Sequence, residues 1–320
     1  MSGEFDLIAE YFLPLAGPEG LGFLDDAACF SSPEGQDIVV TKDLLVEGIH
    51  FVGDEAPASI AMKCLAVNLS DLAAKGAKPA LYWLGISVPK DKPGDWVGHF
   101  ASGLKAMQER SGIALAGGDT TASLGGITVS ITALGYVPKG GMLRRTTARA
   151  GDDIYVTGTL GDAALGLRVV QGALASDAYL AERYRTPTPR NSFGEAIRTI
   201  ATACADISDG LLADVGHIAI GSGVCVRIEE KLLPISDHAA DAVRQSPALR
   251  HLIYSGGDDY ELVFTAPKPM AGKISSLANA HDVAVTCVGR VEEGEGVRLV
   301  DPDGKLVQAA KRGFDHFSNT

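Results

Sequence analysis

Aspartates beside glycine, serine or threonine recur along this sequence and are the residues best suited to chemistry. They occur in six short motifs: Asp25-Asp26, Thr41-Lys42-Asp43, Asn68-Leu69-Ser70-Asp71, Gly117-Gly118-Asp119-Thr120-Thr121, Asp206-Ile207-Ser208-Asp209-Gly210 and Gly256-Gly257-Asp258-Asp259. One such motif alone is typical of a helix cap or a turn. Six of them together predict a set of short loops that present carboxylates.

Four of these motifs directly follow strongly apolar runs, which predicts that their aspartates lie at the ends of buried elements. The four aspartates are Asp43, Asp71, Asp119 and Asp206. Side chains in such positions can converge on one cleft, where their charges repel one another unless a cation is present. Mg²⁺ prefers oxygen ligands and commonly bridges carboxylates to substrate phosphates. We therefore expect several magnesium ions, with ATP as the polyanion that they hold.

Other polar residues fit a phosphate site, each with a plainer alternative. The Gly117-Gly118 pair would let backbone N–H groups approach phosphate oxygens, or it forms an ordinary turn. Arg144 and Arg145 could neutralise charge on a transferring phosphoryl group, or they are a solvated pair. His50 could contact an acceptor phosphate or hydroxyl, or it is structural.

Several classes of protein are excluded by the composition and by missing motifs. The sequence has no Walker A loop, no dinucleotide-binding glycine motif, no protein-kinase motifs and no arrangement typical of a covalent nucleophile. Its net charge of −12 argues against nucleic acids and anionic membranes as partners. The five cysteines are far apart, and neither a signal peptide nor a membrane-spanning run is visible, so we expect a cytoplasmic protein with reduced thiols.

A chain of 320 residues fits two domains of ordinary size. Hydrophobic patterning predicts strands and helices in both halves. The expected strands are residues 37–41, 80–88, 126–137, 154–157, 224–228, 262–265 and 284–288, and the expected helices are 5–13, 59–74, 96–111, 161–171, 192–202 and 211–221. Residues 138–153 are rich in glycine and charge and lack this patterning, so we divide the chain into domains 1–147 and 148–320.

The order and spacing of the motifs resemble those of the thiamine-monophosphate kinase family. The resemblance rests on VTKDLLVEGIHF, NLSDLAAKGAKP, GGDTT, YVTGTLGD, ADISDGLLADVGHI, SGGDDYELVFT and the terminal GFDHF, and it extends from about residue 3 to residue 317. That family shares a superfamily with aminoimidazole ribonucleotide synthetase and selenophosphate synthetase. The resemblance implies an α+β fold with an N-terminal mixed-sheet domain that pairs across a homodimer and a C-terminal α/β domain.

The resemblance also implies an activity, which is direct, in-line, Mg²⁺-assisted transfer of phosphate from ATP to thiamine monophosphate without a phosphoenzyme. The implied metal positions are Asp26, Thr41, Lys42, Asp43, Asp71, Asp119, Asp206 and Asp209. The implied ATP contacts are Gly118, Asp119, Arg145 and Ser208, and the thiamine side is His50, Asp258 and Phe314. Catalysis is assigned to Asp43, Asp71, Asp119 and Arg145.

This sequence departs from the family pattern at three positions: Lys42 replaces Thr or Ser, Asp258 replaces Glu, and Leu24 replaces Gly. Two other classes of function remain open at this stage. One is another ATP-dependent member of the superfamily, such as an amide-activating ligase or a selenophosphate synthetase-like enzyme. The other is a non-catalytic sensor of nucleotide or metal, for which the same acidic motifs would suffice.

Overall fold

The computed structural model describes residues 4–92, 94–307 and 313, which form two compact units. The first unit contains Met1–Leu72 and Ala77–Gly140, and the second contains Ala73–Gly76 and Gly141–Thr320. The division at 147/148 stays a prediction about where the domains separate. Residues between the two boundaries bond to the second unit, since the Cys204 N–H donates to the Arg144 carbonyl oxygen at 3.0 Å.

The first unit is built on a four-stranded mixed sheet in the order β1-β4-β2-β3. Its strands are β1 (Gln36–Val46), β2 (Lys78–Pro89), β3 (Ala114–Ser123) and β4 (Thr128–Pro138). Strand β4 runs antiparallel to both β1 and β2, whereas β2 and β3 are parallel. The long helix α3 (Gly94–Ser111) makes the crossover that a parallel pair requires.

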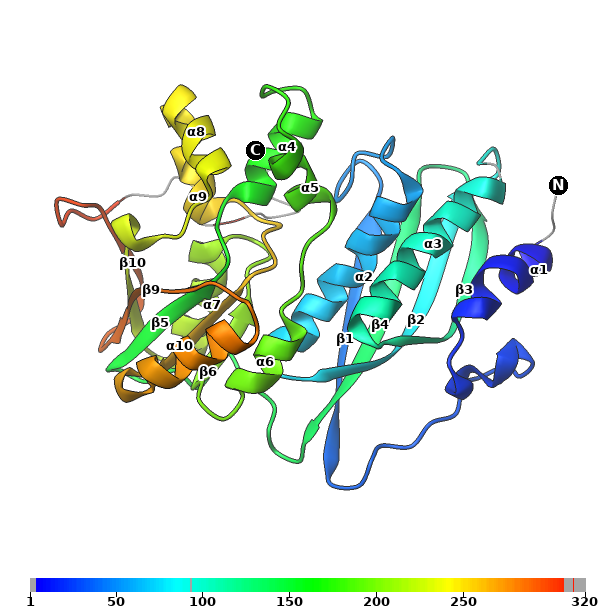
Figure 1. The fold of residues 1–320 in the computed structure, drawn as a ribbon, viewed down its shortest axis with the longest axis horizontal. Coiled ribbons are helices and arrows are strands. Elements are labelled where there is room, and N and C mark those ends of the chain that lie inside the picture. Colours follow the sequence, from blue (N-terminus) through cyan, green and yellow to red (C-terminus); the bar gives the residue numbers. More distant parts are fainter. Residues whose placement is uncertain (1–3, 93, 308–312, 314–320) are drawn as a thin grey trace. The chain divides into compact units, whose positions relative to one another are not determined.

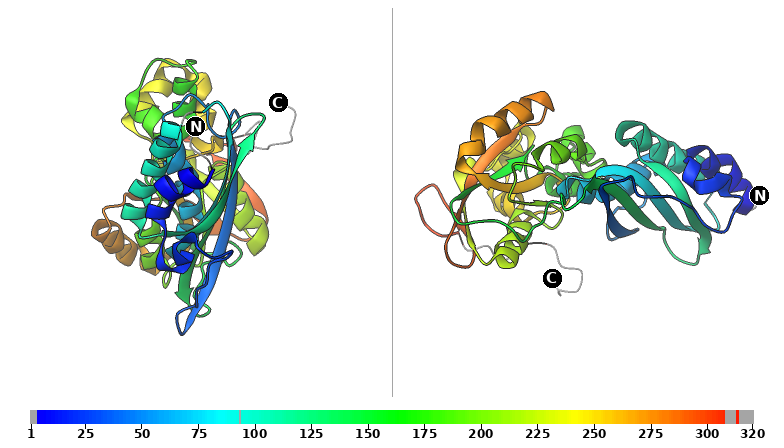
Figure 2. Two further views of the ribbon diagram at one scale, coloured as in Figure 1. Left: turned by 90° about the vertical axis from the view of Figure 1, so that its right-hand side faces the viewer. Right: turned by 90° about the horizontal axis from the view of Figure 1, so that it is seen from below.

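Helices α2 (Pro57–Ala74) and α3 lie along one face of this sheet (Figures 1 and 2). The buried apolar residues of the two helices pack onto the strands, with Leu65, Leu69 and Phe100 fully buried. The alternation of a strand sends every second residue of β1 to the opposite face. There Ile38, Val40 and Leu44 are 42%, 60% and 55% exposed, so this face carries an apolar stripe that the described residues leave open to solvent.

The second unit holds a six-stranded sheet in the order β10-β7-β9-β5-β8-β6. Its strands are β5 (Asp152–Thr157), β6 (Ala203–Asp206), β7 (Cys225–Glu229), β8 (Leu262–Pro267), β9 (Val285–Glu292) and β10 (Gly296–Val300). All neighbouring pairs are antiparallel except β10 and β7. The strands β5 and β8 are buried along nearly their whole length, as expected for central strands.

Seven α-helices of the second unit accompany this sheet in the described part of the chain (Figure 1). They are α4 (Asp162–Val170), α5 (Ala178–Arg185), α6 (Asn191–Ile197), α7 (Leu211–Ser222), α8 (Asp237–Gln245), α9 (Leu252–Ser255) and α10 (Ala271–Ala280). The large apolar cluster around Ile154, Leu165 and Val215 forms one side of the core. The expected α+β class, with an N-terminal mixed-sheet domain and a C-terminal domain of sheet and helices, is therefore confirmed, and pairing between two copies stays a prediction.

Two of the predicted short loops lie inside strands instead. Thr41-Lys42-Asp43 is in the middle of β1 and Gly117-Gly118-Asp119 belongs to β3, whereas Asn68–Asp71 is in α2, as the predicted helix 59–74 implies. The loop interpretation of the first two was wrong because polar residues on a half-exposed strand resemble turn residues in sequence. None of the described helices is long and apolar enough to cross a membrane.

Candidate active site

Two carboxylates meet on the helix-covered face of the first sheet. Asp43 lies on β1 and Asp71 lies near the end of α2. The Thr41 hydroxyl, two residues before Asp43 on the same face of the strand, donates to Oδ2 of Asp71. The strand and the helix therefore bring together three of the residues expected to bind metal.

The electrostatics of this pair differ from those of an ordinary ion pair. Burial raises the pKa of Asp43 to about 7, and repulsion from the Asp71 carboxylate adds to the effect. Oδ2 of Asp43 is buried and has no hydrogen-bond donor among the described residues. A buried carboxylate oxygen without a partner is costly, because it has lost water and gained nothing in return.

A hard divalent cation fits this set of donors. The side chains offer two carboxylates and a hydroxyl, which are the oxygen ligands that Mg²⁺ prefers. Asn68, one turn before Asp71 on α2, adds a fully buried side-chain carbonyl oxygen that also lacks a donor. The motif containing Asn68 was noted in the sequence, but its amide was given no role, because Asn on a helix carries no signal of its burial.

A second group of expected residues lines a cavity of about 560 Å³ in the first unit. Asp26, Lys42, Gly118 and Asp119 all contribute to its wall, together with apolar residues of the N-terminal segment and with Trp83. The strand register explains why these cavity-lining residues do not lie beside Asp43. Lys42 and Asp119 alternate to the sheet face opposite Asp43, and the Lys42 ammonium donates to Oγ of Ser130 at 2.6 Å.

The Gly117-Gly118 pair is part of strand β3 and does not form the predicted turn. Gly118 stands beside Leu84 on β2, and a Cβ at Gly118 would lie 2.0 Å from the Leu84 carbonyl oxygen. The ladder between β2 and β3 shifts register between Tyr82 and Trp83, next to this contact. Glycine is required here for close approach of two strands.

The second unit contributes a loop from Asp206 to Gly210, between β6 and α7. Asp214, in the first turn of α7, accepts hydrogen bonds from the N–H groups of Ser208 and Asp209, both at 3.1 Å. Burial raises the pKa of Asp214 well above its usual range, and the nearby Asp206 and Asp209 carboxylates add to it. The structure therefore brings together Asp206, Ser208 and Asp209, and it adds Asp214, to which the sequence analysis gave no role.

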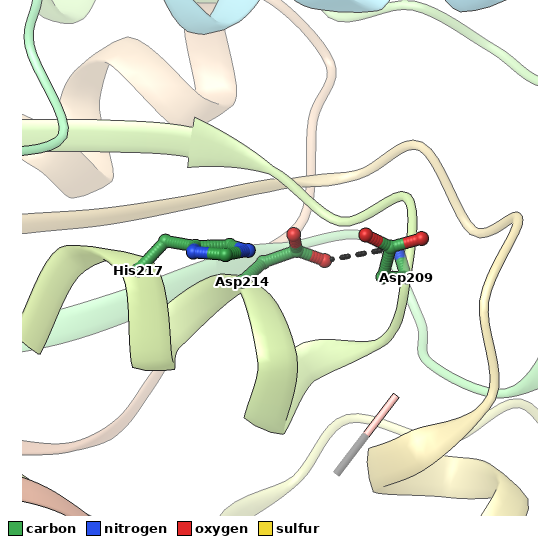
Figure 3. Close-up of side chains that lie close together, drawn as sticks. All are labelled: Asp209, Asp214 and His217. Carbon is green, nitrogen blue, oxygen red and sulfur yellow. Dashed lines mark hydrogen bonds between the residues drawn. The ribbon is translucent and has the colours of Figure 1, made fainter. Parts of the chain in front are cut away.

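Ligand atoms of Asp209, Asp214 and His217 lie within 4.8 Å of one another (Figure 3). Asp214 is buried, whereas His217 is exposed. Asp214 and His217 are three residues apart on α7 and so share one face of that helix. This spacing was legible in the motif that follows Asp206, and it was the available signal for Asp214.

The loop of residues 256–260 lies beside the 206–210 loop in the same unit. The Asp258 N–H donates to the Ser208 carbonyl oxygen at 2.9 Å, and the Tyr260 N–H donates to that of Ile207 at 2.8 Å. Asp258 has a φ of 71°, a left-handed conformation that aspartate tolerates better than most side chains. The expected substrate residue Asp258 therefore lies next to the expected ATP contact Ser208.

The remaining expected residues are less informative. Nδ1 of His50 accepts a hydrogen bond from the Val46 N–H at 3.0 Å, which ties the ring to the turn after β1. Arg145 is exposed in the segment before β5. Phe314, expected beside the thiamine ring, lies outside the described residues. Their roles stay predictions.

Comparison with known proteins gives matches over nearly the whole length of the chain. The model for the N-terminal domain of AIR synthase related proteins matches residues 24–137, and the model for the C-terminal domain matches residues 149–302. Thiamine-monophosphate kinase of Salmonella typhimurium is 42% identical over 328 residues, covering 99% of this chain and 98% of that protein.

Solved structures agree with this placement. The crystal structure of thiamine-monophosphate kinase from Stenotrophomonas maltophilia is 42% identical, with a TM-score of 0.81, and the match covers 89% of this chain and 90% of that one. A structure described as AaThiL complexed with AMPPCP and TMP is 32% identical, with a TM-score of 0.80 and coverage of 98% and 97%.

Proposed function

Because the chain belongs to the thiamine-monophosphate kinase family, we propose that it transfers the γ-phosphoryl group of ATP to thiamine monophosphate, giving thiamine diphosphate. The family resemblance seen in the sequence is thereby confirmed. The observation that carries the proposal is the buried Asp43 carboxylate, which has an unpartnered oxygen and lies beside Asp71. A divalent cation would stabilise such a pair, and phosphoryl transfer uses divalent cations to neutralise phosphate oxygens.

Magnesium ions are part of the proposal. Asp43, Asp71 and Thr41 would hold one group of ions. Asp26 and Asp119 in the first unit, and separately Asp206 and Asp209 in the second unit, would bind others. Bound magnesium neutralises phosphate oxygens, which lowers the barrier to attack by another phosphate. The ligand assignment for Lys42 can concern only its backbone carbonyl, since an ammonium group is no metal ligand.

The chain's own groups have distinct tasks in this reaction. The Thr41 hydroxyl orients the Asp71 carboxylate, and the glycine surface at Gly118 lets a phosphate chain lie close to the backbone. Lys42 and Arg145 supply positive charge for phosphate oxygens. The acceptor phosphate is already ionised at neutral pH, so no general base is needed and transfer is direct.

The test is a coupled assay of ADP release with thiamine monophosphate, thiamine and other phosphomonoesters as acceptors, with identification of the product. We expect ADP release only with thiamine monophosphate, in step with formation of thiamine diphosphate. ADP release that depends on an amide substrate would favour an amide-activating ligase. Tight ATP binding with no ADP release under any condition would favour a sensor.

A homodimer is also proposed, formed through the open face of β1. Ile38, Val40 and Leu44 project from one side of a strand that pairs only with β4 in the described chain, and a second copy would cover this apolar stripe. Val40→Glu should turn the dimer into a monomer in light scattering coupled to gel filtration. An unaltered protein that is monomeric at micromolar concentration would contradict this.

The cytoplasm is the proposed location. Cys29 and Cys287 are exposed free thiols, and Cys64, Cys204 and Cys225 are buried free thiols. Exposed free thiols persist in reducing compartments, which supports this proposal.

A further inference from the structure

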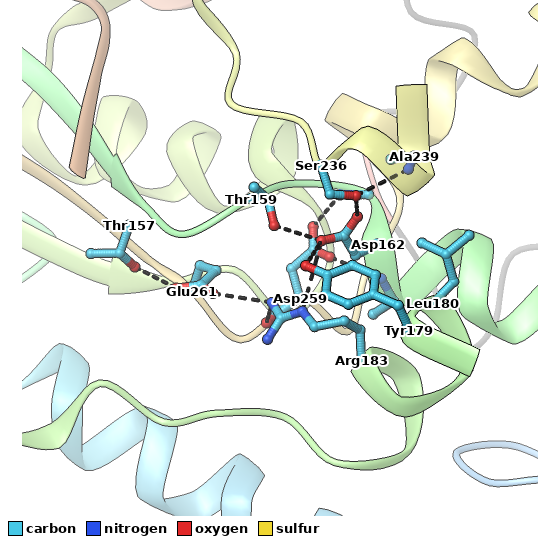
Figure 4. A network of polar contacts seen from close by, with 12 residues as sticks. Thr157, Thr159, Asp162, Tyr179, Leu180, Arg183, Ser236, Ala239, Asp259 and Glu261 are labelled. Atoms are coloured by element: carbon cyan, nitrogen blue, oxygen red, sulfur yellow. Dashed lines mark hydrogen bonds and ion pairs between the residues drawn. The ribbon is translucent and has the colours of Figure 1, made fainter. Parts of the chain in front are cut away.

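A network of buried charges in the second unit has no part in the chemistry described so far. Its carboxylates are Asp162, Asp259 and Glu261, which are 0%, 2% and 1% exposed, and its main cation is Arg183 (Figure 4). Both Asp259 and Glu261 belong to the sequence motif that contains Asp258, in which Asp259 is the next residue and Glu261 follows two positions later.

Glu261 is held by four hydrogen bonds. Arg190 binds it through two of them, Nε to Oε2 at 2.8 Å and Nη2 to Oε1 at 2.7 Å. Arg183 donates to Oε1 at 3.0 Å, and the Thr157 hydroxyl donates to Oε2 at 2.7 Å. Gly158, with a φ of 58°, leaves the space for this carboxylate, because a Cβ there would lie 2.1 Å from Oε1.

Asp259 binds the start of helix α4. Its Oδ2 accepts from the Gly161 N–H at 2.7 Å and its Oδ1 from the Ala163 N–H at 3.2 Å. These donors belong to the first turn of a helix that has no side-chain cap of its own, so Asp259 caps it from another part of the chain. The loop is thereby tied to the scaffold at two side chains, Asp259 and Glu261.

Both residues that flank Asp259 have left-handed backbone conformations. Asp258 has a φ of 71°, which aspartate tolerates, and Tyr260 has a φ of 50°, which a bulky side chain adopts only when its surroundings enforce it. The Ile207 N–H donates to the Glu261 carbonyl oxygen at 2.8 Å, which adds to the bonds from Asp258 and Tyr260 to residues 208 and 207. Three backbone hydrogen bonds therefore join the two loops, and Glu261 and Asp259 bind them to β5 and α4.

We propose that Glu261, Arg190 and Asp259 are positioning residues for phosphoryl transfer, which fix the strained 256–260 loop and through it the 206–209 loop. This inference rests on the proposed function, because only then are Asp258 and Ser208 substrate contacts. A network that served stability alone would not need to be ionic, since apolar residues of similar volume usually stabilise a core as well or better. Its side chains instead set the backbone path of two loops that carry expected site residues.

The experiment compares Glu261→Gln and Arg190→Lys with the unaltered protein. Glutamine keeps the volume but removes the charge that Arg190 pairs with, while Arg183 still has Asp162 at 3.8 Å, and lysine keeps the charge but cannot make the paired bonds. Amide hydrogen exchange is measured over residues 205–211 and 254–262, alongside kcat and KM for both substrates. We expect exchange in these two segments to rise at least tenfold, and kcat/KM for thiamine monophosphate to fall at least tenfold.

Ser236→Ala is the matched control. Ser236 donates to Oδ1 of Asp162 at 2.5 Å and caps α8 through the Ala239 N–H at 3.0 Å, so its loss disturbs the same network away from the loops. The control should lower the melting temperature and leave loop exchange and kcat/KM unchanged.

Three results would overturn the inference. They are unchanged loop exchange in both variants, faster exchange with unchanged kcat/KM, and an equal loss of kcat/KM in Ser236→Ala. Arg190→Lys keeps the test decisive should Glu261→Gln not fold. Failure of the proposed function would look different, because the unaltered protein would then make no thiamine diphosphate while the exchange measurements still reported on the loops.

Discussion

The two units treat buried carboxylates in opposite ways. In the second unit, Glu261 accepts four hydrogen bonds, two of them from one arginine. In the first unit, Asp43 has a buried oxygen with no donor, and its neighbour Asp71 carries the same sign of charge. The sequence around both sites is rich in acidic residues. The sites differ in that arginine side chains bond to the Glu261 carboxylate and no cationic side chain bonds to the buried oxygen of Asp43 in the described residues.

This difference separates a site that is complete from one that needs a ligand. A carboxylate whose oxygens already accept a full set of hydrogen bonds has no lone pair available for a ligand. Its role is to hold the chain in place. A carboxylate that is desolvated and unpartnered retains its binding capacity, and the cost of this state is recovered when a cation binds.

The largest effect is expected for Asp71→Ala on turnover. Loss of a metal-binding carboxylate should reduce kcat/KM about a thousandfold, equivalent to about 4 kcal/mol of transition-state stabilisation. The fold should survive, because removing one of two repelling charges costs the unbound protein little. Steady-state kinetics and circular dichroism measure the two quantities. Near-normal turnover would remove Asp71 from the metal site.

Glu261→Gln should have the largest effect on stability. Breaking a buried ion pair by neutralising one partner typically costs about 3 kcal/mol, because the remaining charges are left without compensation. For a unit of this size the melting temperature should fall by roughly 6–12 °C. A scan in the presence and absence of substrate measures it. A change within about 1 °C would mean that the pairing seen around Glu261 adds no stability.

Gly158→Ala introduces two kinds of strain next to the Glu261 carboxylate, one from the positive φ and one from the contact of the added Cβ. Alanine at a φ of 58° costs about 1 kcal/mol, and its Cβ would also meet Oε1 of Glu261 at 2.1 Å, so we expect a total of about 2 kcal/mol. Gly172→Ala is the control, because Gly172 has a φ of 72° with nothing within 4 Å of the added Cβ. Equal losses of unfolding free energy in the two variants, measured by chemical denaturation, would show that the Glu261 carboxylate moves away from the added Cβ without cost.

The smallest effect concerns the dependence of stability on pH in the absence of magnesium. The pKa of Asp43 is about 7 in the folded chain and near 4 when unfolded. The folded state therefore retains a proton that the unfolded state loses, and stability falls as pH rises from about 4 to 7. Asp43→Asn removes this penalty and should stabilise the magnesium-free protein by about 1 kcal/mol more at pH 8 than at pH 5.

The control for this measurement is Asp119→Asn, on the same sheet but with an exposed side chain. In this variant, the denaturation midpoint should differ from that of the unaltered protein by the same amount at pH 5 and at pH 8. We expect added magnesium to make the unaltered protein the more stable of the two, because a carboxylate is a better magnesium ligand than an amide. Identical midpoints for Asp43→Asn and the unaltered protein at pH 8 would contradict the burial cost.

Much of the fold was predictable from hydrophobic patterning. The strands beginning near residues 37, 80, 128 and 154 and the helices α2, α3 and α7 were expected within a few residues of their bounds. Strand β3 was not, because its residues Gly117-Gly118-Asp119-Thr120-Thr121 have the composition of a loop. Its strand conformation comes from pairing with β2, a tertiary contact that local sequence does not encode.

The sequence predicted which residues belong to the site, but not how their side chains are arranged in space. The carboxylates of Asp43 and Asp71 were expected to converge and do so, whereas Asp119 lies on the opposite sheet face from Asp43. Treating residues 41–43 as a loop hid this difference, because side-chain direction follows from strand alternation. The shared partner of Arg183 and Arg190 could not be seen, since an arginine on α5 and one just before α6 carry no local sign that both bond to Glu261.

Alternation along β1 also limits how this segment can change in length. Thr41 and Asp43 face α2 while Lys42 faces the cavity, so three consecutive codons specify groups on two sides of one sheet. Deleting or inserting one residue before Thr41 would exchange the two sets, sending the carboxylate into the cavity and the ammonium against Asp71. Substitutions can accumulate here one position at a time, but indels cannot, and natural variation in this strand is expected to conserve its length more strictly than its composition.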